Sequence, residues 1–245
     1  MNNAFFSIPG YEVISRNDRK DTTDGVGGGL LIYARNDMTG RVSEYTTSEL
    51  DSFTQTSAIK VRLQGNSEVT LVLLYRPHHI YKDKKPQLDL TTDNNEKLCQ
   101  LLHLIPKPYV IVGDLNYSNI DWERMSSDAA SKKFLTAVQD DFLSQHIEFS
   151  THSSGTQPDV VLSSNCDSVL DVSELGHLGS SDHSLILVTV EGEISRNTTF
   201  EEVPDWRKAD LSWLRQELAS VDWQLENLDT LAAWEAFKCK VHETE

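Results

Sequence analysis

The sequence predicts an α/β domain with mixed or antiparallel sheets, followed by a helical appendage. Apolar, β-branched runs of strand length recur along the first 190 residues. Only two clear amphipathic helices separate them, which is too few for sheets built from parallel crossovers. After Gly192 the chain becomes acidic and rich in tryptophan. At 245 residues it is long enough to bury a substantial core.

The strands are predicted from apolar pattern and flanking turn residues. They cover residues 10–16, 30–34, 59–63, 69–75, 109–112, 158–162, 168–173 and 184–190. Gly65 and Asn66 between the third and fourth strands are typical of a hairpin. Gly27, Gly28 and Gly29 lack the Lys-Ser/Thr of a phosphate-binding P-loop, so a strand-entry bulge or close packing is favoured.

Helices are predicted at residues 92–104 and 127–142, where apolar residues recur at helical spacing. Pro106 and Pro108 end the first of them. Two further helices, acidic and amphipathic, are predicted over residues 205–220 and 227–242. We therefore expect one domain over residues 1–195 and a helical linker or appendage over residues 196–245.

Charge and composition narrow the function classes. The formal net charge is -16, whereas nucleic-acid binders usually carry a basic footprint. No apolar run approaches the roughly 20 residues that span a bilayer, and the first residues lack the basic and apolar regions of a secretory signal. Three widely spaced cysteines favour free thiols over a disulfide framework. We expect an intracellular protein of the cytoplasm or nucleus.

Polar side chains stand at the ends of four predicted strands. They are Tyr75, Asp114 with Asn116, Asp159, and Asp182 with His183. On an extended backbone residues i and i+2 point the same way, so Asp114 and Asn116 can converge on one ligand. If these strand ends meet, carboxylates, an amide, a phenol and an imidazole share one pocket. That inventory suits phosphate-ester hydrolysis with Mg²⁺ or Mn²⁺.

The partner of His183 must come from a distant segment, because neighbours on a strand face opposite ways. Asp159 is the best candidate, and it would fix the tautomer and stabilise the imidazolium. Each motif also has a purely structural interpretation. Asp114 and Asn116 could form an Asx turn after a core strand, and Asp182 a capped turn.

One stretch of the chain is locally basic and interleaved with aromatic residues. Its candidate nucleic-acid contacts are Arg76, His78, His79, Lys82, Lys84 and Lys85. Such a stretch could bind a phosphate backbone, or it could be an ordinary solvated loop.

The order of these motifs resembles the endonuclease/exonuclease/phosphatase superfamily. The motifs are Gly27–Tyr33, Tyr75-Arg76-Pro77, Gly113-Asp114-Leu115-Asn116, Asp159-Val160-Val161-Leu162 and Ser181-Asp182-His183. More closely, they resemble the apurinic-type endonuclease domain of LINE-like, jockey-type non-LTR retrotransposon polyproteins. The Trp-rich segment 205–210 is similar to the connector that precedes reverse transcriptase in them.

The resemblance implies a four-layer α/β sandwich of two mixed sheets flanked by helices, and Mg²⁺-dependent cleavage of DNA. It implies that Asp114 orients or deprotonates the attacking water, that Asn116 holds the phosphate or that water, and that Tyr75 contacts the phosphate. It implies that His183, paired with Asp159, stabilises developing charge. It gives metal contacts to Asp182, Asp114 and Asn116.

The chain departs from the family pattern at its start. The strands that carry the family's asparagine and metal-binding glutamate have no counterpart before Gly10. We therefore expect an N-terminally truncated domain with impaired catalysis. Two alternatives stay open: an inactive remnant that serves as a binding module, and a phosphatase of the same fold acting on inositol phosphates or lipid head groups.

Overall fold

The computed structural model describes residues 6–18, 28–38, 40–53, 55–77, 81–82, 85–86, 88–192, 210–223 and 229–242. The chain divides into two compact units, residues 1–198 and residues 199–245, and each is described by itself. None of the helices in the described residues is long and apolar enough to span a membrane.

The first unit contains most of the regular structure. Its strands are β1 (Tyr11–Asp18), β2 (Gly29–Arg35), β3 (Val42–Glu44), β4 (Thr56–Arg62), β5 (Glu68–Tyr75), β6 (Tyr81–Lys82), β7 (Lys85–Pro86), β8 (Tyr109–Asp114), β9 (Ser144–Gln145), β10 (Asp159–Ser163), β11 (Val169–His177) and β12 (Ser184–Val190). Its helices are η2 (Asn36–Met38), α1 (Ser48–Ser52), η3 (Gln64–Asn66), α2 (Leu88–Leu104), α3 (Lys132–Asp140) and η4 (Cys166–Ser168).

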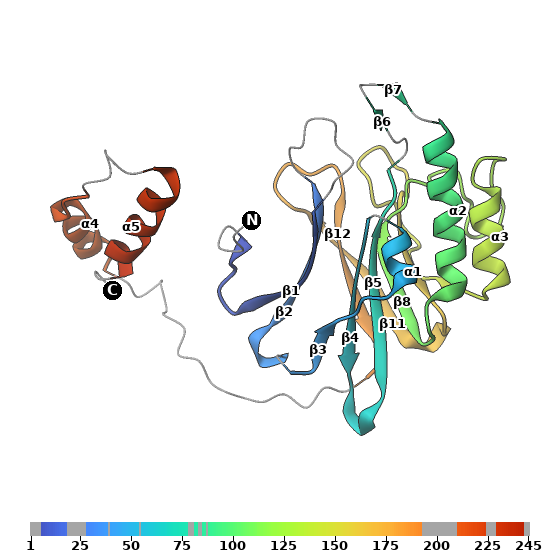
Figure 1. Ribbon diagram of the computed structural model, residues 1–245, viewed down its shortest axis with the longest axis horizontal. Helices are drawn as coiled ribbons and strands as arrows, with labels where there is room; N and C mark the ends of the chain where they lie inside the picture. The colour runs from blue at the N-terminus through green and yellow to red at the C-terminus, as the bar shows by residue number, and fades with distance from the viewer. Residues whose placement is uncertain are drawn as a thin grey trace. The chain divides into compact units, whose positions relative to one another are not determined.

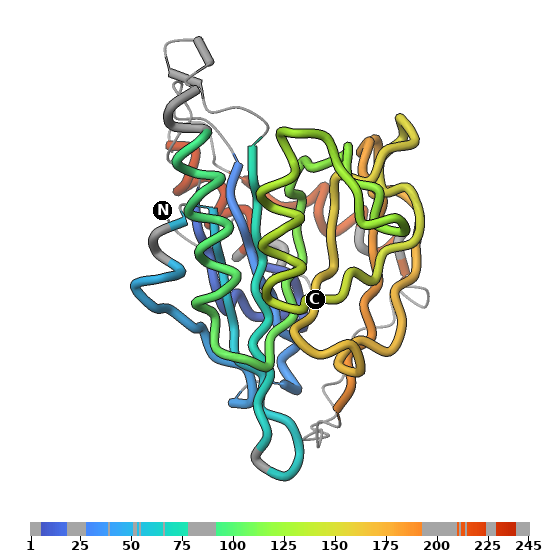
Figure 2. The backbone as a smooth tube through the Cα atoms, turned by 90° about the vertical axis from the view of Figure 1, so that its right-hand side faces the viewer, coloured from blue at the N-terminus to red at the C-terminus, as the bar shows by residue number. Residues whose placement is uncertain are grey.

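A six-stranded mixed sheet with the order β3-β4-β5-β8-β10-β9 forms the centre of this unit. β5 and β8 pair in parallel, and the other neighbours pair antiparallel. The connection between β5 and β8 contains α2, the crossover that a parallel pair requires. The helices α2 and α3 lie beside each other on one face of the sheet (Figures 1 and 2).

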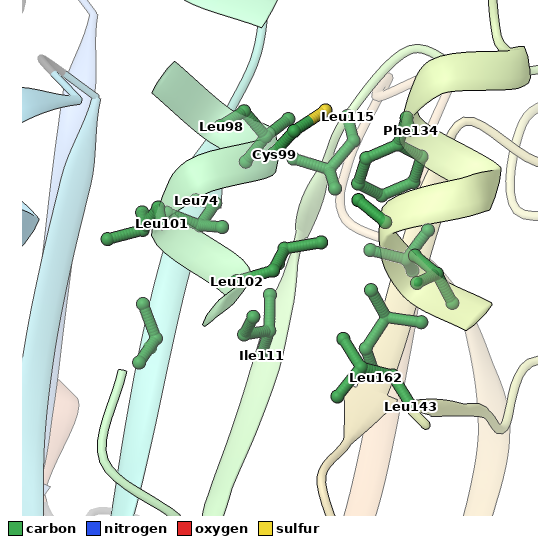
Figure 3. Packing of buried hydrophobic residues seen from close by; sticks show 14 of the residues in the cluster. Leu74, Leu98, Cys99, Leu101, Leu102, Ile111, Leu115, Phe134, Leu143 and Leu162 are labelled. Carbon is green, nitrogen blue, oxygen red and sulfur yellow. The ribbon is translucent and has the colours of Figure 1, made fainter. Parts of the chain in front are cut away.

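The core under the helices explains why these segments are helical. Leu98, Leu101 and Leu102 recur at helical spacing on α2, and each is fully buried. They pack over Leu74 and Ile111 of the sheet, beside the α3 residues (Figure 3). Burial of such an apolar face supplies most of the stability of a helix in a protein.

Two antiparallel hairpins, β1-β2 and β11-β12, form the layer on the opposite face of the sheet. Ile32 and Val188 of these hairpins pack with Val110 and Val161 of the central sheet in a second apolar cluster. The domain is therefore an α/β fold with a multi-stranded mixed sheet flanked by helices, which confirms the predicted class. Where the sequence predicted a second mixed sheet, the described residues form these two separate hairpins.

The predicted strands are found, with shifted ends. Residues 184–190 match β12 in full, whereas β11 extends to His177, beyond the predicted end at residue 173. α2 begins at Leu88, and α3 spans only nine residues. The Ser131 side chain makes no capping hydrogen bond, and residues 129–131 form a turn before α3. The short strand β3 was not predicted, because three residues carry too little pattern.

The second unit contains α4 (Leu211–Ser220) and α5 (Thr230–His242). The Asp210 side chain caps α4, accepting hydrogen bonds from the backbone N–H groups of Ser212 and Trp213. Within this unit Trp223 and Trp234 both stack on Phe237, at 5.2 and 5.6 Å between ring centroids. The predicted helix over residues 205–220 is found from Leu211 onward, and residues 205–209 lie outside the described part.

Candidate active site

Three of the predicted residues lie in one row across three adjacent strands. Tyr75 of β5 pairs with Asp114 of β8, and Asp114 pairs with Asp159 of β10. Partners directly opposite on paired strands project from the same face of a sheet. Asp114 lies two residues after Val112, and Asp159 lies two residues before Val161, so each carboxylate shares a face with its valine. Both valines pack in the cluster under the hairpins, and the row of three therefore faces the hairpins. The sheet register therefore gathers a phenol and two carboxylates at one end of the sheet.

Asn116 reaches this site by a turn, and the predicted strand alternation is wrong here. β8 ends at Asp114, and Asn116 adopts a left-handed backbone with φ of 54°. Asparagine tolerates this conformation better than most residues. The Asn116 backbone N–H donates to Asp114 Oδ1 at 3.2 Å, and its side-chain amide donates to the backbone oxygen of Arg76 at 3.0 Å. The loop after the strand is thus tied to Asp114.

His183 joins the row through Asp159. Its Nδ1 lies 3.0 Å from Asp159 Oδ2, so the histidine comes from a distant loop, as predicted. The same carboxylate oxygen accepts a hydrogen bond from Thr151 Oγ1 at 2.5 Å. Thr151 is fully buried, and the sequence analysis missed it because a lone threonine in a loop carries no signal. Two donors therefore hold the Asp159 carboxylate in place.

The charges of these groups are coupled. Burial, reinforced by the negative charge of Asp159, raises the pKa of the Asp114 carboxyl to about 6. Burial alone would lower the pKa of the His183 imidazole, but the hydrogen bond to Asp159 and the charges of Asp159, Asp114 and Asp182 raise it above its ordinary value. The site therefore contains a carboxyl that titrates near neutral pH beside an imidazole that favours its protonated form.

Asp182 lies at the exposed margin of the site, with 68% of its side chain accessible. Its Oδ2 is 3.3 Å from Nε2 of His152, a residue that the sequence analysis did not single out. The His152 and His183 rings stand edge to face with centroids 5.0 Å apart. No local pattern marks His152, because it enters the site only through the packing of two loops.

Arg76 is placed differently from the prediction. Only 6% of the residue is exposed, so it cannot act as a surface contact for a phosphate backbone. Its guanidinium stacks on the Tyr117 ring at 3.9 Å and donates to Asn95 Oδ1 at 2.7 Å and to the Leu115 backbone oxygen at 2.8 Å. Arg76 therefore fixes the loop that carries Asn116.

The other candidate nucleic-acid contacts are only partly described. His78, His79 and Lys84 lie outside the described residues. Lys82 belongs to β6 and Lys85 to β7, and only their backbones are described. Their proposed contact with DNA remains a prediction from the sequence.

The donor set fits a divalent cation bound by oxygen. Asp114, Asn116 and Asp182 offer two carboxylates and an amide, the hard ligands that Mg²⁺ prefers. Burial, reinforced by the negative charge of Asp159, raises the pKa of Asp114, and nearby protein groups only partly offset that charge. A bound cation would neutralise that charge, so these residues suit a divalent ion.

Comparison with known proteins gives a family match and similar solved structures. Residues 69–187 match the model of a family described as endonuclease-reverse transcriptase. The endonuclease domain of TRAS1, a telomere-specific non-LTR retrotransposon, has a similar structure, with a TM-score of 0.52 and 18% identity over 76% of this chain and 81% of that chain. Over residues 69–187 the chain is similar to this endonuclease-reverse transcriptase family, and its fold is that of the endonuclease domain. The resemblance in motif order is thereby confirmed.

A second solved structure, the Xenopus laevis APE2 catalytic domain, matches with a TM-score of 0.50 and 15% identity over 76% of this chain and 77% of that chain. At these identities the two structures establish the shared fold. No curated protein matches the chain. The family match over residues 69–187 includes Tyr75, Asp114, Asp159 and His183.

Proposed function

We propose that the chain is the DNA endonuclease domain of a non-LTR retrotransposon polyprotein and cleaves phosphodiesters with Mg²⁺ or Mn²⁺. The position of Asp159 carries this proposal. It lies in register with Asp114 and 3.0 Å from His183, so it links the carboxylate row of the sheet to the imidazole. If these residues served only as turns or helix caps, Asp159 would need neither the pairing with Asp114 nor the contact with His183.

In this proposal Asp114 orients the attacking water and accepts its proton. A carboxyl with a pKa of about 6 is deprotonated at neutral pH and still basic enough to take up a proton. His183, held by Asp159, donates from Nε2 to the phosphoryl oxygen and stabilises the developing charge. Tyr75 and Asn116 contact the scissile phosphate.

Asp114, Asn116 and Asp182 would hold the cation. When bound, it supplies positive charge to the phosphate oxygens. This charge also offsets the repulsion between DNA and a chain with a net charge of -16. Lys82, Lys84 and Lys85, with His78 and His79, would bind the DNA backbone.

The proposal includes the surroundings of the domain. Residues 1–195 would form the endonuclease domain and residues 196–245 a helical linker toward a reverse transcriptase. The family match over residues 69–187 supports this arrangement, because that family is described by both activities. We propose an intracellular location, in the cytoplasm or the nucleus, where DNA is the target.

A plasmid assay tests the proposed function. The purified chain should nick supercoiled DNA with Mg²⁺ or Mn²⁺, and a chelator should abolish nicking. Asp114→Ala and His183→Ala should each lower the rate at least about 100-fold, because each removes a group that acts on the proton or the developing charge. Asp167→Ala and His103→Ala are matched controls, because both residues are exposed and lie on other elements.

The assay also decides between the alternatives. Nicking that survives both Asp114→Ala and His183→Ala would refute the site. A folded protein without hydrolysis in either ion would favour the binding module. Release of phosphate from inositol phosphates, with plasmid left intact, would favour the phosphatase.

A further inference from the structure

His152, Asp182 and His183 form a compact group at the mouth of the site. His152 lies in the loop between β9 and β10, and the other two lie in the loop between β11 and β12. One potential ligand atom from each residue lies within 4.8 Å of the other two. Two imidazoles and a carboxylate form a donor set that differs from the oxygen ligands proposed for Mg²⁺.

Backbone hydrogen bonds hold the two loops together at this point. His152 and His183 form an isolated antiparallel bridge. The Ser184 N–H donates to the Thr151 oxygen at 2.9 Å, and the Ser153 N–H donates to the Asp182 oxygen at 2.8 Å. These bonds flank the histidine pair, and in such a non-hydrogen-bonded pair the side chains lie close on the same face.

Both histidines are oriented through Nδ1. His183 Nδ1 contacts Asp159 Oδ2 at 3.0 Å, and His152 Nδ1 contacts Ser154 Oγ at 2.7 Å. Metal-binding histidines are usually held in this way by a partner on the second nitrogen. Both Nε2 atoms then remain for a metal, and His152 Nε2 already lies 3.3 Å from Asp182 Oδ2.

The tautomer of His152 sets a cost for metal binding. The Ser154 backbone N–H also points to His152 Nδ1, at 3.0 Å, and this contact favours a proton on Nε2. Coordination through Nε2 moves that proton to Nδ1, and the Nδ1–H then donates a hydrogen bond to Ser154 Oγ. Ser154 is exposed, so water can satisfy its released N–H. We therefore expect moderate affinity.

Imidazole ligands favour Zn²⁺, Co²⁺ or Ni²⁺ over Mg²⁺. Three protein ligands with one open position are the usual arrangement of an accessible zinc site. Tetrahedral ligands about 2.0 Å from zinc are roughly 3.3 Å apart, so the group must contract slightly. Asp182 is largely exposed and has room to rotate inward.

We propose that His152, Asp182 and His183 bind Zn²⁺ or a similar transition-metal ion, and that the bound ion inhibits hydrolysis by occupying Nε2 of His183. Binding stands on the donor geometry alone. Inhibition rests on the proposed function, because it requires that His183 contact the phosphate.

Spectroscopic titration of the full chain with Co²⁺ tests binding without reference to activity. A saturable visible absorption that Zn²⁺ abolishes is expected, and Mg²⁺ should not abolish it. His152→Asn removes a proposed ligand and should weaken Co²⁺ binding at least about 10-fold. Ser154→Ala removes the partner of His152 Nδ1 and should weaken binding about 10-fold, because such outer partners tune metal affinity to this extent. His103→Asn should have no effect, since this half-exposed histidine lies on α2.

Absence of the saturable signal, or unchanged Co²⁺ affinity in His152→Asn with native circular dichroism, would overturn the site.

The second measurement is plasmid nicking in Mg²⁺ with added Zn²⁺. Inhibition is measured relative to the rate of each protein in Mg²⁺ alone, and His152→Asn should need at least about 10-fold more Zn²⁺ for half-inhibition. Equal inhibition of both proteins would overturn the inhibitory role. A wild-type chain that binds Co²⁺ without nicking DNA would refute the proposed function and leave the metal site standing.

Discussion

At the scale of single residues, Asp114 shows how a functional group opposes stability. Its carboxyl is half-buried beside Asp159, and the pKa is raised from 3.8 to about 6. The folded state therefore retains a proton that the unfolded chain has lost between these two pH values. Stability contributed by this group falls as the pH rises through that interval, and the deficit is constant above about pH 6.

Asp114→Asn should therefore stabilise the fold at neutral pH and remove nicking. A shift of about two pKa units corresponds to about 3 kcal/mol, and solvent screening reduces our expectation to about 1 kcal/mol at pH 7.5. The gain should nearly vanish at about pH 3, where both states are mostly protonated and Asn has no advantage. Urea unfolding at the two pH values measures it. A gain independent of pH would show that charge is not the cause, and Asp167→Asn is the exposed control.

Arg76 was predicted to contact DNA, but its position in the fold gives it a structural role. Its buried guanidinium bonds to Asn95 and to the Leu115 oxygen and stacks on Tyr117. Burial lowers the pKa of this guanidinium, but arginine stays charged in proteins. The internal bonds compensate for its lost hydration.

Arg76→Lys should lower the free energy of unfolding by about 2 to 3 kcal/mol, because an ammonium cannot reproduce the planar set of hydrogen bonds. Nicking should also fall, since the loop that carries Asn116 loses its support. The salt dependence of DNA binding should not change. A decrease of about one in the slope of log affinity against log salt would instead indicate a lost phosphate contact. Arg124→Lys, at an exposed position, is the stability control.

At the scale of elements, the parallel pairing of β5 with β8 aligns the site. This pairing places Leu74 opposite Gly113 one step before Tyr75 meets Asp114. A Cβ on Gly113 would lie 1.9 Å from the Leu74 carbonyl oxygen. Glycine is therefore needed for the close approach of the two strands, and a slip of one residue would turn Asp114 to the other face.

Gly113→Ala should destabilise the protein by at least about 3 kcal/mol, because rigid backbone atoms must move apart. Nicking should fall with it, since Asp114 is the next residue. Gly40→Ala is the comparison. It has open space around it and φ of +84°, so it should cost only about 1 to 2 kcal/mol for its backbone conformation. Thermal unfolding of both variants checks that Gly113→Ala is the more destabilising. Equal losses of stability in the two variants would contradict the steric explanation.

At the scale of the whole molecule, charge and function oppose each other. The chain carries 38 acidic and 22 Lys or Arg side chains and a net charge of -16. The affinity of the chain for DNA should therefore come from the locally basic segment that contains Lys82, Lys84 and Lys85, and from the bound cation. Long-range repulsion should keep passive binding weak.

Binding of an Asp114→Ala chain to duplex DNA should depend less steeply on salt than the binding of a strongly basic DNA-binding protein. Three lysines, Lys82, Lys84 and Lys85, predict a slope of log affinity against log salt of about -3. K82Q/K84Q/K85Q should bring the slope close to zero. Fluorescence anisotropy from about 20 to about 200 mM KCl measures both proteins. A slope steeper than about -6 would indicate a broader basic surface than the sequence contains.

The sequence determined the strands, the two domain helices and the order of the polar motifs, because period, turn residues and caps are local properties. β12 is an example, since its apolar run and the flanking Asp182 and Gly192 define its ends. The sequence also predicted that Asp159 is the partner of His183, through the family resemblance and the need for a distant carboxylate.

Only the tertiary structure decided which groups meet. The register of β5, β8 and β10 aligned Tyr75, Asp114 and Asp159, loop bridging brought His152 to His183, and burial removed Arg76 from the surface. Each outcome depends on contacts between segments far apart in the chain, and local sequence pattern contains no record of such contacts. Pairing and burial of the whole chain set these positions, so they became visible only in the folded molecule.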